Sequence, residues 1–314
     1  MSNQSSENMD IAASSADKRR TTHGLLAAFG AFFSWGIFPL YFKSFGDVPA
    51  LEIMAHRIVW SLVFVGLIVL VGKRISQLKE AVTNKKTLMV FAATTLLIGI
   101  NWLTFVWAIS VDRLLEASLG YYINPLVSVV LGMLFLKERL NRWQIVAVAF
   151  ATCAVIWLTV QAGALPWVSL VLAFSFGFYG LLRKMLTTES AVGLAVETAL
   201  LAPISAAYIV YLMMSGTVMG GDGNTHSYDL PNFLLFFGTG IVTAMPLILF
   251  SMGAQRLRLG TVGLMQYIAP SMHVVLAVLV FKEPVSDAQI GAFIFIWIGL
   301  IIYSWDGIRN RKKS

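Results

Sequence analysis

The chain has 314 residues, of which 58% are hydrophobic and only 12% are charged. A soluble globular domain carries about 25% charged residues, so the composition excludes a protein whose surface faces water. The single cysteine excludes an intrachain disulfide, and with only four histidines we expect no metal site and no cofactor.

The first 22 residues are polar and lack the apolar core of a signal peptide, so we expect a disordered tail over 1–22. Apolar segments of roughly 20 residues follow, each long enough to cross a hydrocarbon layer of ~30 Å. They do not alternate in polarity as the strands of a β-barrel would. The sequence therefore predicts an all-α polytopic membrane protein with ten transmembrane helices, at 24–42, 49–71, 87–110, 116–136, 142–160, 165–182, 190–214, 231–254, 261–281 and 288–305.

Lysine and arginine concentrate in alternate connections between these segments. Both tails and every second loop together hold 19 of the 23, whereas the remaining loops hold only Lys43, Arg113 and Lys282. The positive-inside rule places the first set in the cytoplasm, with both termini. The net charge of +7 is thus a topology signal, and we expect the lipid bilayer rather than nucleic acid as partner.

The sequence repeats itself at an offset of 145 residues. The segment Tyr-Ile-Asn-Pro at 122–125 matches Tyr-Ile-Ala-Pro at 267–270, and Lys-Glu at 137–138 matches Lys-Glu at 282–283. A nearby offset of 141 pairs Gly36 with Gly177. We expect two five-helix repeats, 23–160 and 165–306, followed by a basic cytoplasmic tail at 307–314. An odd number of helices inverts the second repeat, an arrangement typical of transporters that work by alternating access.

These motifs resemble the EamA domains of the drug/metabolite transporter superfamily. The stretches Glu-x-x-x-His-Arg at 52–57, Leu-Glu-Ala-Ser-Leu-Gly-Tyr-Tyr-Ile-Asn-Pro-Leu at 115–126 and Gln-Tyr-Ile-Ala-Pro at 266–270 are more similar still to its RarD subgroup. The resemblance covers the chain outside its two tails. It implies a permease of the bacterial inner membrane and, within the superfamily, export or exchange of a solute that could be an amino acid, a sugar, a cation or a drug.

Prolines interrupt several of the predicted spans. Pro125 and Pro270 occupy corresponding positions in the two repeats, which points to the solute-binding region. A proline also frees the carbonyl four residues earlier, so Pro39 would free that of Trp35. Such carbonyls could face a solute, or neighbouring side chains could satisfy them in static kinks.

Ionisable groups inside spans are costly and commonly functional. Glu197 could carry the coupled proton or could be a structural carboxyl. Arg57 could attract an anionic group of a solute, reach the outer interface, or form a structural ion pair. His56 and Glu52, four residues apart on one helix face, are more simply a local pair.

Other polar and aromatic side chains could line a solute site or could pack within the bundle. His273 shares a predicted helix face with Gln266 and Pro270. Glu116 lies at the start of its span, where a carboxylate suits the helix N-terminus. The remaining candidates for solute contact are Asn101, Trp102, Tyr122, Asn124 and Tyr267.

Three functional classes fit a polytopic chain of this kind. The first is a secondary transporter of a small organic solute, driven by a proton gradient or a solute gradient, because no Walker motif for ATP hydrolysis occurs. The second is an intramembrane enzyme acting on lipids, although we assign no catalytic residues. The third is a channel or a non-transporting membrane protein. The sequence leaves the solute and the oligomeric state open.

Overall fold

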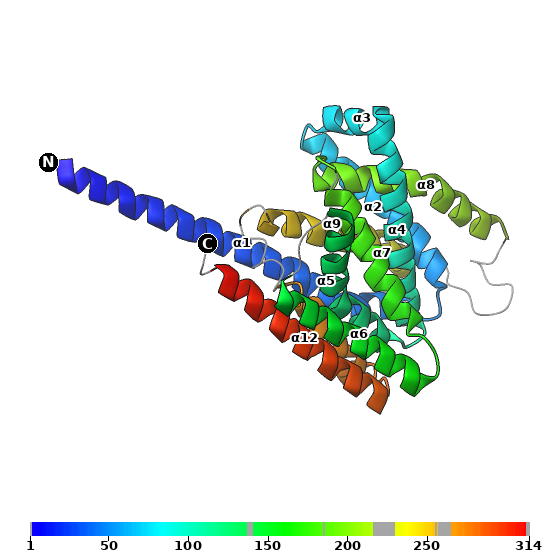
Figure 1. Cartoon of the computed structure of the whole chain (residues 1–314). Helices are drawn as coiled ribbons and strands as arrows, with labels where there is room; N and C mark the ends of the chain where they lie inside the picture. The colour runs from blue at the N-terminus through cyan, green and yellow to red at the C-terminus, as the bar shows by residue number, and fades with distance from the viewer. Residues whose placement is uncertain are drawn as a thin grey trace.

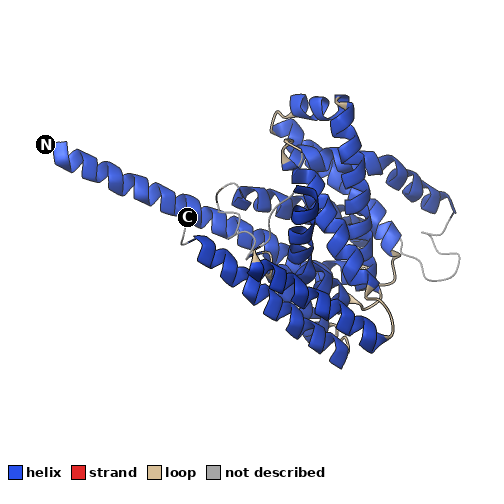
Figure 2. Ribbon diagram, viewed as in Figure 1, coloured by secondary structure: helices blue, strands red, loops and turns tan. Residues whose placement is uncertain are grey.

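The computed structural model describes residues 2–136, 141–184, 186–215, 230–254, 256 and 265–311. Figure 2 shows helices and loops throughout these ranges. In chain order the elements are α1 (Ser2–Lys43), α2 (Ala50–Val71), α3 (Ile75–Thr83), α4 (Lys85–Ser110), α5 (Leu114–Leu136), α6 (Arg142–Ala162), α7 (Trp167–Lys184), α8 (Ser190–Ser215), α9 (Leu230–Ala254), α11 (Ile268–Val275), the π-helix η1 (Leu276–Val280) and α12 (Asp287–Arg311).

Seven of these helices are long and apolar enough to cross a membrane, and they lie in α1, α2, α4, α5, α6, α8 and α9. Three shorter apolar helices, Trp167–Arg183, Ile268–Val280 and Asp287–Tyr303, coincide with predicted spans. The all-helical class is confirmed, whereas the count of ten transmembrane helices stays a prediction. The Lys-Glu pair at 137–138 lies outside the described residues.

Helix α1 begins far earlier than its apolar part. It is helical from Ser2, although the sequence predicts a disordered tail over 1–22, and its apolar span begins at Thr21. The stretch before Gly24 contains neither proline nor glycine, so nothing in it terminates a helix. Figure 1 shows this first part projecting away from the other helices.

The bundle has two ends that differ in charge. At one, which we call the basic end, α2 ends, α4 begins and α7 passes into α8; Arg74 and Glu189 form an ion pair of 2.6 Å there. Helix α3 lies at this end (Figure 1). At the opposite end α1 and α4 terminate, α5 begins and η1 leads towards α12. Lys43 and Asp112 are paired at this opposite end, 2.5 Å apart.

Helix α5 lies in the middle of the largest buried cluster. Leu114, Leu119 and Leu126 are fully or almost fully buried within it. Gly120 lets α5 approach α7 closely, because a Cβ at this position would lie 2.6 Å from the Ser169 carbonyl oxygen. Small residues of this kind let helices pack in membranes, where no hydrophobic effect drives helix association.

Candidate functional site: a polar centre in the bundle

Arg57 of α2 lies in the interior of the bundle with only 4% of its surface exposed. Its Nε donates a hydrogen bond of 3.0 Å to Thr243 Oγ1 of α9. The guanidinium lies 4.2 Å from the ring centroid of Trp102 on α4 and 5.4 Å from that of Phe42 on α1. Four helices thus converge on one buried cation, which excludes the possibility that Arg57 reaches towards the interface.

Asn101 joins α4 to α5 and α7. Its Nδ2 donates to the Leu172 carbonyl at 3.1 Å and to Ser175 Oγ at 3.0 Å. Its Oδ1 accepts from the Tyr121 hydroxyl at 3.3 Å. Since Asn101 is only 1% exposed, these bonds satisfy an amide that would otherwise be costly to bury. Asn101 and Trp102 are neighbours, so α4 connects this group to Arg57.

His273 approaches the same region from α11. Its Nε2 donates to the Trp35 carbonyl at 3.0 Å, the carbonyl that Pro39 removes from the helical pattern of α1. A side chain from another helix therefore satisfies this proline break. The imidazole ring lies 6.1 Å from the Tyr121 ring and 5.4 Å from the Phe105 ring, measured between centroids. We call Arg57, Asn101, Trp102, Tyr121, Thr243 and His273 the central cluster.

Glu197 of α8 lies outside the central cluster, in a polar group of its own. It is 1% exposed. The Thr94 hydroxyl lies 2.7 Å from its Oε1, and the Tyr179 hydroxyl donates to its Oε2 at 3.2 Å. Arg183 Nη1 lies 3.9 Å from Oε1, and its guanidinium stacks over Phe91 at 5.4 Å. The carboxyl is therefore hydrogen-bonded and also faces a cation.

A line of polar side chains on α7 connects the two groups. Ser175, Tyr179 and Arg183 are spaced four residues apart, so they share one face of the helix. Ser175 contacts Asn101 of the central cluster, whereas Tyr179 and Arg183 contact Glu197. The line therefore runs from the centre of the bundle to the basic end, where α7 terminates.

The repeat-related tyrosines form a third group. Tyr122 and Tyr267 stack with their ring centroids 6.2 Å apart, and Tyr122 shares a hydrogen bond of 2.6 Å with Ser271. Gln266 and Tyr267 lie in a turn before α11. A single helix face through Gln266, Pro270 and His273 is therefore wrong, because Pro270 stands in the first turn of the helix, where a missing N–H costs little.

Pro125 and Asn124 lie within α5. Pro125 is inside the helix, and the helix continues through it. Asn124 is 3% exposed and lies next to Gly177 of α7, not in the central cluster. The structure thus brings Arg57, Asn101, Trp102 and His273 together and places the other predicted residues elsewhere.

Glu283 closes the opposite end. Its Oε1 and Oε2 accept from the backbone N–H groups of Leu114 and Leu115, at 2.9 and 3.0 Å, at the start of α5. Burial raises the pKa of the Glu283 carboxyl, while these two N–H groups oppose the shift. The sequence predicted Glu116 for this role; instead Glu116 pairs with Arg113 at 2.6 Å, because a neighbour three residues away is within easy reach on the same helix.

Lys43 strengthens this closure. Besides its pair with Asp112, its Nζ donates to the Ile109 carbonyl at 3.3 Å and lies 5.8 Å from the Phe281 ring centroid. One side chain thus links the end of α1, the end of α4 and the segment after η1.

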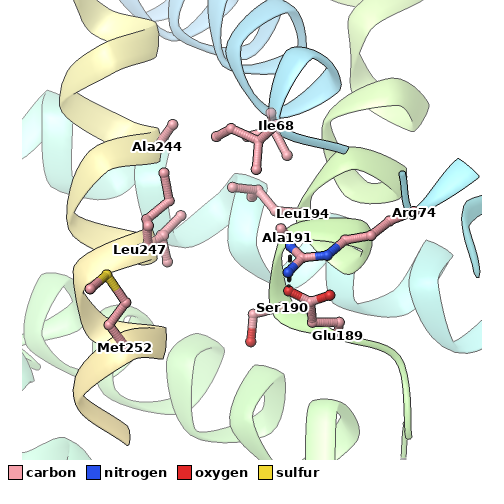
Figure 3. A pocket seen from close by; sticks show the side chains of 11 residues that line it. Ile68, Arg74, Glu189, Ser190, Ala191, Leu194, Ala244, Leu247 and Met252 are labelled. Atoms are coloured by element: carbon pink, nitrogen blue, oxygen red, sulfur yellow. Dashed lines mark ion pairs between the residues drawn. The ribbon is translucent and has the colours of Figure 1, made fainter. Parts of the chain in front are cut away.

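The basic end is hollowed. A cavity of about 150 Å³ lies between α2, α8 and α9. Figure 3 shows Leu247 and Met252 of α9 on one side and Leu194 of α8 opposite them, with the Arg74–Glu189 ion pair at the edge. The lining is mostly apolar, so a solute entering here would meet polar groups mainly at the mouth.

Sequence reasoning missed several partners in these groups, among them Thr94, Tyr179, Arg183 and Thr243. Hydroxyl groups inside apolar helices are common, so Thr94, Tyr179 and Thr243 do not stand out alone, and Arg183 follows directly after a predicted span, where a basic residue reads as a topology signal. One signal was available for Thr94. Thr94 and Thr239 are separated by 145 residues, and so are Glu52 and Glu197, so the repeat places a threonine and a carboxylate at matched positions in both halves.

The EamA-like transporter family matches residues 22–160 of this chain. Protein RarD of Escherichia coli (strain K12) is 42% identical over 298 residues, which cover 95% of this chain and 99% of that protein. The Uncharacterized transporter YojE of Bacillus subtilis (strain 168) is also 42% identical over 298 residues, covering 94% and 97%. The Chloramphenicol-sensitive protein RarD of Pseudomonas aeruginosa is 29% identical over 304 residues, covering 94% and 98%.

A solved structure adds a likeness of fold. It is 18% identical, with a TM-score of 0.57, and the match covers 90% of this chain and 97% of the other. The family and the names of the relatives point to a multi-pass bacterial membrane transporter rather than an enzyme. With its helical bundle and its close, full-length relatives, this chain belongs to the EamA-like transporter family, alongside proteins named RarD.

Proposed function

We propose that this protein is a secondary active transporter of the bacterial inner membrane. It exports or exchanges a small organic solute by alternating access, with proton coupling through Glu197 and with both termini in the cytoplasm. The observation that carries the proposal is the central cluster, in which a buried cation and hydrogen-bonding side chains from α2, α4, α5, α9 and α11 meet inside an apolar bundle. Intramembrane ionisable groups of this kind commonly mark solute or ion pathways.

Element boundaries support two inverted repeats. Helices α4 and α9 begin at Lys85 and Leu230, and α6 and α12 begin at Arg142 and Asp287; both pairs are separated by 145 residues. Helix α4 begins at the basic end, whereas α9 ends there, with Met252 beside the cavity. Related helices therefore run in opposite directions, as inversion requires.

Two close helix contacts are related to each other by the sequence repeat. A Cβ at Gly36 of α1 would lie 2.5 Å from Met272 Sδ of α11, and a Cβ at Gly177 of α7 would lie 2.9 Å from Val127 Cγ1 of α5. Gly36 and Gly177 are related by the offset of 141, and Val127 and Met272 by that of 145. The first helix of each repeat thus packs against the fourth helix of the other, so exchanging the two conformations would exchange the open end.

The difference between the closed opposite end and the hollowed basic end supports a conformation that is open towards the cytoplasm. Glu283 and Lys43 hold the opposite end together, whereas the cavity lies at the basic end. The positive-inside rule places the basic end in the cytoplasm.

The polar line on α7 supports proton coupling. When Glu197 takes up a proton, its carboxylic acid can donate to the Tyr179 oxygen in place of the bond that Tyr179 donates to the carboxylate, and Ser175, one turn earlier on α7, accepts from Asn101. Arg183 lies on the side of Glu197 towards the basic end, so protonation of the carboxyl would weaken an attraction between α7 and α8.

The experiment uses sealed vesicles that contain the purified protein and an entrapped pH dye. A mixture of the twenty amino acids, chloramphenicol and sodium benzoate are added separately under an imposed pH gradient. We expect at least one of them to cause saturable proton movement, which Glu197→Gln abolishes while the folded yield stays near normal. Glu80→Gln, which removes an exposed carboxylate on α3, serves as the matched control and should behave as the wild type.

The other outcomes separate the alternative functions. Normal proton-coupled movement by Glu197→Gln would reject this residue as the coupling site. Flux that rises linearly with concentration would indicate a channel, and the absence of any flux would favour a non-transporting membrane protein or an enzyme.

A further inference from the structure

Among the residues that the structure describes, Arg57 is a buried cation without a counter-ion. No carboxylate of the described residues lies within 4 Å of its guanidinium; the protein surrounds it with two aromatic rings and the Thr243 hydroxyl. A structural arginine in an apolar interior normally pairs with an acid, because an isolated buried charge is very costly. The missing negative charge is therefore the feature that needs explanation.

One nitrogen of this cation and the hydroxyl of a neighbouring serine are available to a ligand. Within the described part of the chain, Arg57 Nη1 and Ser61 Oγ are buried and have no hydrogen-bond partner. Ser61 follows Arg57 by four residues on α2, so both side chains lie on one helix face. Together they offer two adjacent donors, which is the pattern that two oxygens of a carboxylate accept.

This face leads to the cavity at the basic end. Val65, four residues beyond Ser61, lines the cavity, and so does Ala244, which follows the Thr243 bonded to Arg57. Eight residues of helix separate Val65 from Arg57, about 12 Å along the axis. A solute in the cavity thus needs to advance by about two helical turns to reach the guanidinium.

We propose that Arg57 and Ser61 bind the carboxylate of the transported solute, and that Trp102 and Phe42 contact its apolar body. The solute class is a small carboxylate with an apolar or aromatic group. The single positive charge matches a monoanion rather than a phosphate dianion. This inference rests on the proposed transport function and specifies its substrate.

The test compares four probes that share one apolar body and differ in the head group. These are 3-phenylpropionate, L-phenylalanine, 2-phenylethylamine and 3-phenyl-1-propanol, added to the purified full-length protein in lipid nanodiscs while thermal stabilisation is measured. We expect 3-phenylpropionate to bind at least about tenfold more tightly than the amine and the alcohol, since a charge-assisted hydrogen bond is lost in both. L-Phenylalanine should bind with intermediate affinity, because its carboxylate is accompanied by an ammonium group.

Variants assign this preference to the site. Arg57→Gln should remove the preference for the carboxylate, Arg57→Lys should retain part of it, and Ser61→Ala should weaken the two carboxylates, 3-phenylpropionate and L-phenylalanine, but not the amine or the alcohol. Arg142→Gln, which removes a cation at the start of α6, is the control and should leave all four affinities unchanged. If Arg57→Gln does not fold, Arg57→Lys and Ser61→Ala still show whether the carboxylate preference depends on this site.

Equal binding of the amine or the alcohol, failure of all four probes to bind, or an unchanged carboxylate preference in Arg57→Lys and Ser61→Ala would overturn the inference. Measuring uptake of 3-phenylpropionate into vesicles separates a failure of this inference from a failure of the proposed transport function. Binding that depends on Arg57 without uptake would refute transport and leave the carboxylate site standing. Transport of the amine that does not depend on Arg57 would support the transport function and refute the carboxylate site.

Discussion

Thr94 and Thr95 are neighbours on α4 and both are buried, yet their hydroxyl groups have different surroundings. The Thr94 hydroxyl lies 2.7 Å from Glu197 Oε1, whereas Thr95 Oγ1 has no hydrogen-bond partner among the described residues. Valine has nearly the shape of threonine and lacks the hydroxyl. The Thr94 hydroxyl also lies 3.0 Å from the Phe91 carbonyl oxygen of its own helix, so the pair measures the contribution of the whole hydroxyl group beside the buried carboxyl.

We expect Thr94→Val to lower the free energy of unfolding by about 1–3 kcal/mol, because it leaves a buried carboxyl oxygen without its donor. Thr95→Val should be neutral or slightly stabilising, since it removes a buried hydroxyl that is already unsatisfied. Unfolding of both variants in the same detergent, followed by circular dichroism, makes the comparison. Equal losses in the two variants would show that the Thr94 hydroxyl, including its bond to Glu197, contributes nothing.

At this scale the sequence predicts which residues are unusual better than it predicts their partners. Arg57, Asn101 and His273 stand out because polar groups are rare in apolar spans. Pro39 also predicts a free carbonyl at Trp35, but only the fold shows that His273 satisfies it. Thr243 could not be selected, because its role depends on how α2 and α9 are placed beside each other.

Among the elements, the contact between α5 and α7 depends on a glycine. We expect Gly120→Ala to destabilise the protein measurably, because the new methyl group would lie 2.6 Å from a backbone oxygen, which cannot move aside as a flexible side chain can. Gly66→Ala on α2 is the matched control, since nothing lies within 4 Å of its Cβ position; it should be neutral or stabilising by up to ~1 kcal/mol. Thermal unfolding measures both, and a harmless Gly120→Ala would contradict the close packing.

The cap on α5 should make the opposite end sensitive to pH. Burial raises the pKa of the Glu283 carboxyl above its value of ~4.3 in an unfolded chain, so the folded protein binds this proton more tightly. The resulting stabilisation is complete below ~4.3 and is lost as the pH rises through the folded pKa. Glu283→Gln should flatten this part of the stability profile, whereas Glu80→Gln should retain it; a profile unchanged by Glu283→Gln would refute the assignment.

For the molecule as a whole, the two ends should face different compartments. With Cys153 replaced by serine, a cysteine at Lys282 should react with a membrane-impermeant maleimide in intact cells. A cysteine at Lys79 of α3 should react only after the membrane is opened. Labelling of both positions in intact cells would contradict the proposed topology.

The helical class and the positions of the apolar segments could be predicted from hydropathy, because lipid requires each span to satisfy its own backbone hydrogen bonds. The helical structure of the tail at 1–22 and the first residue of α11 were harder to predict from the sequence. Helix ends depend on local breaks such as the turn at Gln266 and Tyr267. The identity of the cap on α5 was beyond reach, because Glu283 is 169 residues from Leu114 in the chain. Such long-range pairs arise only when the bundle assembles.

The position of Lys43 has a consequence for the cell. Because this one lysine is bound to the ends of two helices and lies beside a third segment, moving any one of these parts away from the others breaks one of its contacts. An end held by several contacts at once would admit few stray ions in the intervals between the proposed transport cycles. For the gradient-driven transport proposed above, this closure would let a cell keep idle copies in its membrane without dissipating its electrochemical gradient.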